Sequence, residues 1–154
     1  MNPDLFGFLL LLVHLAATCY MAGLIWFVQT VHYPLFAAVG SERFAEYERA
    51  HASRTAPVVG PPMLLEAATA LALPVVPLPH VSPVAPWLGL AVLVLIWLST
   101  FFVQVPRHRE LASGFEAGSH RRLVVTNWVR TVAWSARAGL GLWMMVRLGQ
   151  GTFR

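Results

Sequence analysis

The chain has 154 residues, of which 57% are hydrophobic and only 12% are charged. Because a soluble domain carries about 25% charged residues, this composition excludes a water-soluble globule and predicts a single integral membrane domain, residues 1–154. The net charge of +4 rests on 11 basic residues that are all arginine, and their scatter along the chain excludes nucleic-acid binding and favours contact with lipid headgroups.

Four continuous apolar stretches follow one another, at about residues 5–31, 56–79, 87–105 and 120–148. A helix needs roughly 20 apolar residues to cross a bilayer, and only helices or closed barrels satisfy the backbone there. The stretches do not alternate as barrel strands would. The predicted fold is therefore all-α, a polytopic membrane four-helix bundle made of two hairpins.

The segment between the first two stretches predicts an interfacial helix. Pro34 should end or bend the first span, where Tyr33 is read as part of an interfacial aromatic belt. Ser41 can cap a new helix that places Phe44 and His51 on one face. This amphipathic helix is either separate or the base of the second span. Three prolines predict that the start of that span is kinked or broken: Pro57, Pro61 and Pro62.

The basic residues predict the orientation of the spans. Most arginines lie in or near the first and third connecting loops, whereas the other side has only Arg147 and Arg154. The positive-inside rule therefore places loops one and three in the cytoplasm and both termini outside a multi-pass inner (plasma) membrane. Ser119 is expected to cap the last helix, and His120 beside it is expected to be solvated.

The polar residues suggest an internal repeat. A shift of 76 positions places His32 on His108, and His51 on Asn127. Phe27-Val28-Gln29 matches residues 102–104 if one residue is inserted before the second histidine. If the repeat is real, the two hairpins surround a pseudo-twofold axis along the membrane normal, with His32 opposite His108 and His51 opposite Asn127.

These histidines are candidates for two kinds of chemistry. His32, His51 and His108 could hold a borderline metal such as iron, zinc or copper. His32 and His51 could equally act as general bases near neutral pH. No HxxxH or HxxE spacing supports a metal, and interfacial histidines are commonly only solvated. Haem is disfavoured, because His14 is the only histidine deep in a predicted span.

Glu66 is the strongest single anomaly, since it stands within the second predicted span. A carboxylate at that depth costs about 2.5 kcal/mol or more, so Glu66 should face the bundle interior beside a partner. Arg130 and Arg137 are the candidates. Such a pair could be purely structural, or Glu66 could handle protons while the arginines hold an anionic ligand. Three residues are candidates for holding a cofactor or ligand: Arg54, Asn127 and Arg137.

Together, His32, Phe44, residues 51–54 (HASR), residues 62–67 (PMLLEA) and residues 127–131 (NWVRT) resemble the small four-helix membrane proteins grouped with the anthrone oxygenases. The likeness covers about residues 20–145. It implies a compact four-helix bundle and, as in the characterised members, oxygenation of polycyclic phenolic substrates. The chain departs from the family pattern after the third span, where Pro106-Arg107-His108-Arg109 stands in place of an asparagine-rich stretch.

The leading hypothesis is an integral membrane oxygenase or related redox enzyme acting on a hydrophobic small molecule. His32, His51, Glu66 and Arg130 are its expected catalytic residues, with a non-haem iron or copper ion as the candidate cofactor. Two alternatives stay open. One is a non-enzymatic membrane binder or carrier of haem, quinone or lipid, working alone or as a homo-oligomer. The other is a structural subunit whose polar residues only specify packing.

Overall fold

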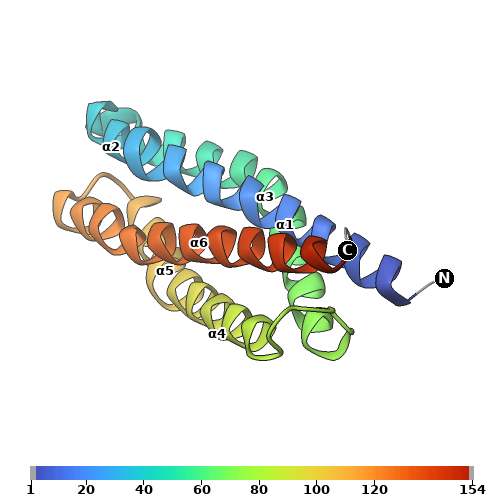
Figure 1. Ribbon diagram of the computed structural model, residues 1–154. Coiled ribbons are helices and arrows are strands. Elements are labelled where there is room, and N and C mark those ends of the chain that lie inside the picture. The colour runs from blue at the N-terminus through green and yellow to red at the C-terminus, as the bar shows by residue number, and fades with distance from the viewer. Residues whose placement is uncertain (1–2, 153–154) are drawn as a thin grey trace.

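A computed structural model describes residues 3–152, and this part of the chain consists of helices joined by short loops, without strands (Figure 1). The first helical rod comprises α1 (Pro3–Phe27), a π-helical turn (Val28–His32), α2 (Tyr33–Leu35) and a 3-10 turn (Phe36–Ala38). The second is α3 (Ser41–Ala72), with a 3-10 turn at Leu73–Val75. The third comprises α4 (Val84–Ser99), a π-helical turn (Thr100–Gln104) and α5 (Val105–Leu111), and the fourth is α6 (Ala117–Thr152).

Three of these helical segments are long and apolar enough to cross a membrane: Asp4–Ala38, Ser41–Val75 and Val84–Leu111. This confirms the prediction of an all-helical protein of membrane type. The fourth segment, α6, has 36 residues but is not one of these three, and arginines such as Arg130 and Arg137 occur along its length.

For the region between the first two rods, the sequence left two alternatives open, a separate interfacial helix or the base of the second span, and the structure shows the second. α3 runs without interruption from Ser41 to Ala72, so the amphipathic segment is the base of the second apolar helix. Pro57, Pro61 and Pro62 lie inside this helix and do not break it. A proline removes one backbone hydrogen bond, and long membrane-type helices tolerate that loss where neighbouring groups satisfy the freed carbonyl.

Two π-helical turns stand directly before prolines. Pro34 follows the turn Val28–His32, and Pro106 follows the turn Thr100–Gln104. Proline has no N–H group, and its ring displaces the carbonyl four residues earlier, which in both cases lies inside the π-helical turn. The first rod therefore continues past Pro34 to Ala38 through a widened turn. Such turns often occur at functional sites, and here each precedes residues of the polar cluster described below.

The rods pack side by side (Figure 1), with α1 against α3 and α6, and α4 against α6. Their contacts enclose a core that includes Met21, Phe36, Phe44, Ile96 and Trp134. Large apolar side chains also cover the outside, for example Leu64, Leu71 and Phe102. By contrast, many polar side chains are buried between the rods. An apolar exterior around a polar interior suits a lipid environment.

Candidate functional site

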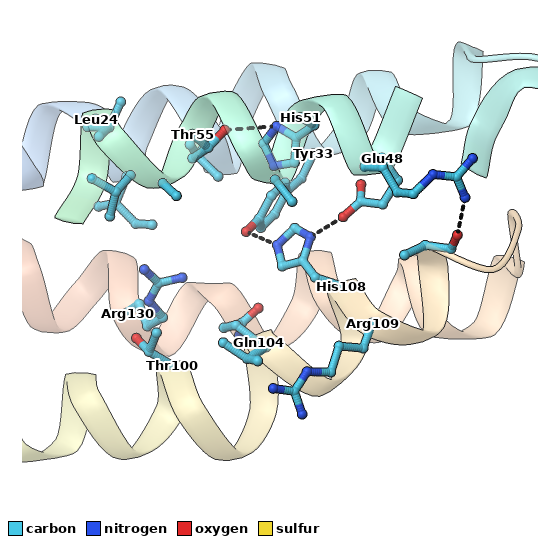
Figure 2. Close-up of a pocket in the computed structure, with 18 of the residues that line it drawn as sticks. Leu24, Tyr33, Glu48, His51, Thr55, Thr100, Gln104, His108, Arg109 and Arg130 are labelled. Atoms are coloured by element: carbon cyan, nitrogen blue, oxygen red, sulfur yellow. Dashed lines mark hydrogen bonds and ion pairs between the residues drawn. The ribbon is translucent and has the colours of Figure 1, made fainter. Parts of the chain in front are cut away.

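His108 is the centre of a polar cluster near the loop ends of the helices (Figure 2). Its Nδ1 atom lies 2.5 Å from Oε1 of Glu48, and its Nε2 atom lies 2.8 Å from the hydroxyl oxygen of Tyr33. Glu48 from α3 and Tyr33 from α2 are both buried. An ionised Glu48 accepts the Nδ1–H hydrogen bond, which leaves Nε2 to accept the hydrogen bond that the Tyr33 hydroxyl donates.

His51 lies one helical turn beyond Glu48 on α3 and faces the same cluster. Its ring centre is 5.5 Å from that of His108. Its Nδ1 atom lies 2.8 Å from Nε2 of His32 and 3.1 Å from Oγ1 of Thr55. His32 and Thr55 therefore fix the orientation of the His51 ring from behind.

Glu48, His51 and His108 lie close enough together to hold a metal ion. Each offers one ligand atom, and these atoms all lie within 4.8 Å of one another. Two histidines with one carboxylate form the ligand set that non-haem iron(II) oxygenases use, with coordination positions left open. Of the predicted metal ligands, His51 and His108 belong to this group, whereas His32 lies one hydrogen bond behind His51.

Sequence reasoning missed Glu48, although a local signal was present. Glu48-Arg49-Ala50-His51 is a Glu-x-x-His pattern, which places a carboxylate and an imidazole on one helix face, as in the di-iron proteins built on helical bundles. Tyr33 was missed as well, because its hydroxyl meets a histidine 75 residues later in the chain. No pattern within the sequence predicts that contact.

A cavity of about 470 Å³ lies beside the cluster. Most of its wall is apolar, with Met21, Leu24, Ile25, Val28 and Val59 among the lining residues. Figure 2 shows Glu48, His51, His108 and Tyr33 on one part of the wall and Thr100, Gln104 and Arg130 on another. The exposed residues Ala52, Ala56 and Arg109 also line the cavity, so it opens to the molecular surface between α3 and α5.

A second cavity, of about 420 Å³, lies on the other side of His51. It is lined by His32, Tyr47 and the exposed Arg54. Arg54 therefore lies apart from the larger cavity and from the group of possible metal ligands. His51 lines both cavities, together with Leu24, Val28 and Thr55, whereas His32 lines only the second.

A layer of amides lies next to the cluster in the interior. Asn127 donates a hydrogen bond of 2.9 Å to Oε1 of Gln29 and accepts one of 3.2 Å from Arg130. Gln29 donates to the carbonyl of Val124, and Gln104 donates to the hydroxyl of Thr126. The two glutamines thus bond across helices. Asn127 bonds within this layer rather than opposite His51, where the repeat would place it, so the repeat stays a prediction.

Glu66 belongs to a separate buried group. Arg137 donates hydrogen bonds to the Glu66 carboxylate and to the carbonyl of Gly89. His14 lies 3.8 Å from the same carboxylate, and its other ring nitrogen contacts Thr69. The inward Glu–Arg pair is therefore present, with Arg137 as the partner. Because Glu66 follows His51 by 15 residues on α3, it lies roughly 22 Å further along the helix and does not join the histidine cluster.

His120 differs from its expected solvated state. It is half-buried, and its Nε2 atom lies 2.8 Å from the carbonyl oxygen of Tyr33. The same carbonyl also accepts a hydrogen bond from the backbone N–H group of Phe36, so His120 is its second partner. His120 therefore supports the segment that carries the Tyr33 hydroxyl.

The described helices and this cluster define an all-helical protein of membrane type with a polar, histidine-rich site beside an apolar cavity. Comparison of the chain with known protein-family models, with curated proteins and with solved structures finds no match.

Proposed function

We propose that the protein is an integral membrane oxidoreductase that binds a non-haem metal through Glu48, His51 and His108. Its substrate is a hydrophobic small molecule held in the adjacent cavity of about 470 Å³. The observation that carries this proposal is a carboxylate and two imidazoles with ligand atoms within 4.8 Å of one another at the wall of that apolar cavity. Iron is the first candidate, because this ligand set suits iron(II), and copper is the second.

An oxygenase is the redox enzyme that we favour. Three protein ligands leave coordination positions open for dioxygen and substrate. The resemblance to the anthrone oxygenases points to the same reaction class. Among the neighbouring residues, His32 orients the His51 ring through Nδ1, and Tyr33 orients His108 through Nε2. With a metal on Nδ1 of His108, the ring proton would lie on Nε2, which would then donate a hydrogen bond to the Tyr33 hydroxyl.

The proposal also includes the topology of the chain. All four helical rods cross the inner (plasma) membrane as two hairpins, and the loops around Gly40 and Gly114 lie in the cytoplasm with both termini outside. The arginines near those two loops support this orientation. The metal site would then lie near the cytoplasmic surface of the membrane.

Metal binding tests the proposal directly. Purified protein, stripped with chelator and loaded with iron(II) without oxygen, should retain about one ion per chain, as measured by elemental analysis after desalting. Glu48→Gln, His51→Asn and His108→Asn should each weaken iron binding roughly tenfold or more, because even second-shell changes cost 10- to 100-fold. His80→Asn is the matched control, since His80 is an exposed histidine in a loop. Equal iron binding by the wild type and the three site variants would contradict the metal site.

A non-enzymatic carrier of a hydrophobic molecule is the second candidate. Two sizeable cavities flank His51, and cavities of this size accommodate small molecules without any metal. This function would be favoured if the protein bound no metal but co-purified with a hydrophobic compound that the His51→Asn variant also retained.

A further inference from the structure

Arg130 and Arg137 lie seven residues apart on α6 and are both buried, with 7% and 3% of their surface exposed. Arg137 forms an ion pair with Glu66. Among the described residues, no ion pair includes Arg130. One helix thus carries two buried cations, and within residues 3–152 only one of them forms an ion pair.

The neighbours of Arg130 do not neutralise its charge. One terminal nitrogen donates a hydrogen bond of 3.2 Å to the neutral amide of Asn127, and the guanidinium group also meets the uncharged hydroxyl of Tyr33. The buried Nε atom has no hydrogen-bond partner. Placing an uncompensated cation in a low-dielectric interior is costly. A bound anion would remove most of that cost.

The cavity is the place where such an anion can reach Arg130. Arg130 is one of the residues that line it, and Figure 2 shows the side chain extending from α6 toward the space that Tyr33 and His108 also face. Glu48 is the only acidic residue that lines this cavity, and its carboxylate is hydrogen-bonded to His108 rather than to Arg130. Arg49 and Arg109 also line the cavity, so its wall has an excess of positive charge.

We propose that Arg130 is an anion-binding subsite and that the cavity takes an apolar organic acid. The hydrocarbon part would lie against Met21, Ile25 and Val28, and an oxyanion, such as a carboxylate, would meet the guanidinium group. Arginine suits this task because its planar fork donates two parallel hydrogen bonds to an oxyanion. The inference rests on the proposed function for the identity of the cavity, but it needs no metal.

A pair of matched probes tests this subsite: 2-naphthoate, which is anionic, and 2-naphthamide, its neutral isostere. Both are titrated, with chelator present, against protein in phosphatidylcholine nanodiscs, and binding is corrected with protein-free nanodiscs. Wild-type protein should bind the naphthoate at least about tenfold more tightly than the amide, because hydrogen bonds to an ionised acceptor are stronger than those to a neutral one. Arg130→Met should abolish this preference and leave binding of the amide nearly unchanged.

Two further variants make the result specific. Arg122→Met removes an exposed arginine of the same helix and should keep the full preference. Arg130→Lys keeps the cation but loses the fork, so an intermediate preference is expected, and this variant serves if Arg130→Met does not fold. The proposal is overturned if wild-type protein binds both probes equally, or if Arg130→Met retains the preference.

The same titration separates this inference from the metal proposal. Because chelator is present throughout, wild-type protein should show the preference for the naphthoate whether or not it retains iron in the metal-binding experiment. A preference that is lost in His51→Asn but kept in Arg130→Met would assign the anion to the histidine cluster and overturn the role of Arg130. Added phosphatidylglycerol should not displace the naphthoate; displacement would assign the subsite to a lipid headgroup instead.

Discussion

The buried acids Glu48 and Glu66 show how far single residues can be interpreted from sequence. Glu66 stands out because it interrupts a long apolar run, and the cost of burying a charge predicts that it faces inward with a cationic partner. The structure supplies Arg137 as that partner. Glu48 lies in an amphipathic segment that also contains exposed acids, so its charge attracts no notice although it is fully buried. Its role depends on His108, which lies 60 residues away.

The Glu66–Arg137 pair predicts a strong effect on stability. Glu66→Gln should destabilise the fold by about 3–5 kcal/mol, because it leaves the Arg137 cation buried without its counter-charge. The double variant Glu66→Leu with Arg137→Met removes both charges and should recover most of that loss. Thermal unfolding in detergent measures both effects. A Glu66→Gln variant as stable as the wild type would argue against a buried pair that stabilises the fold.

At the scale of elements, the start of α6 shows a local detail that differs from the expected cap. The Glu116 carboxylate accepts hydrogen bonds from the backbone N–H groups of Gly118 and Ser119, at 2.8 and 2.5 Å. The Ser119 hydroxyl instead donates to Glu110. Ser119 was a reasonable choice from sequence, but a carboxylate is an equally good acceptor for the free N–H groups of a first turn.

This cap predicts a dependence on pH. The backbone hydrogen bonds from Gly118 and Ser119 lower the pKa of Glu116 below its ordinary value of 4.5. A carboxyl group whose pKa is lowered by folding stabilises the folded state when the pH is above the ordinary pKa. This stabilisation is lost as the pH falls through the lower pKa of the folded state. Glu116→Gln should therefore unfold at a lower temperature than the wild type at pH 7. The difference should shrink when the pH is lowered below about 4.5, and a difference independent of pH would contradict the role of the charged cap.

The π-helical turns were outside the reach of sequence analysis. Pro34 was expected to end or bend a helix, which is the ordinary effect of proline. The structure accommodates both Pro34 and Pro106 by widening the preceding turn. Whether a helix stops or widens depends on the packing around it, and that packing is set by helices distant in sequence.

At the scale of the whole molecule, composition and hydropathy were sufficient to predict an all-helical protein of membrane type. Both quantities can be calculated from the sequence alone. In lipid, only helices and closed barrels satisfy the backbone hydrogen-bonding groups, so long continuous apolar stretches predict helices. The meeting of Tyr33, Glu48, His51 and His108 depends instead on how three rods pack. The sequence could therefore identify the individual histidines but not the ligand set.

The proposed topology leads to a prediction on labelling. In a Cys19→Ser background, which removes the chain's single cysteine, Ser82→Cys and Ser113→Cys place one thiol in each of two exposed loops. A membrane-impermeant maleimide added to intact spheroplasts should label the Ser82→Cys variant but not the Ser113→Cys variant. Both should react after permeabilisation, which controls for reactivity. The opposite pattern before permeabilisation would reverse the orientation.

The larger cavity opens between α3 and α5, among exposed alanines of a largely apolar outer surface. The position of this opening affects how the affinity for a ligand must be expressed. Under the proposed function and topology, a ligand that enters there would be drawn from the lipid phase, and occupancy would follow its mole fraction in the bilayer rather than its molarity in water. Doubling the lipid at constant total ligand would then halve the effective concentration of a fully partitioned compound. A dissociation constant measured for this protein must therefore be reported together with the amount of lipid or detergent in the sample.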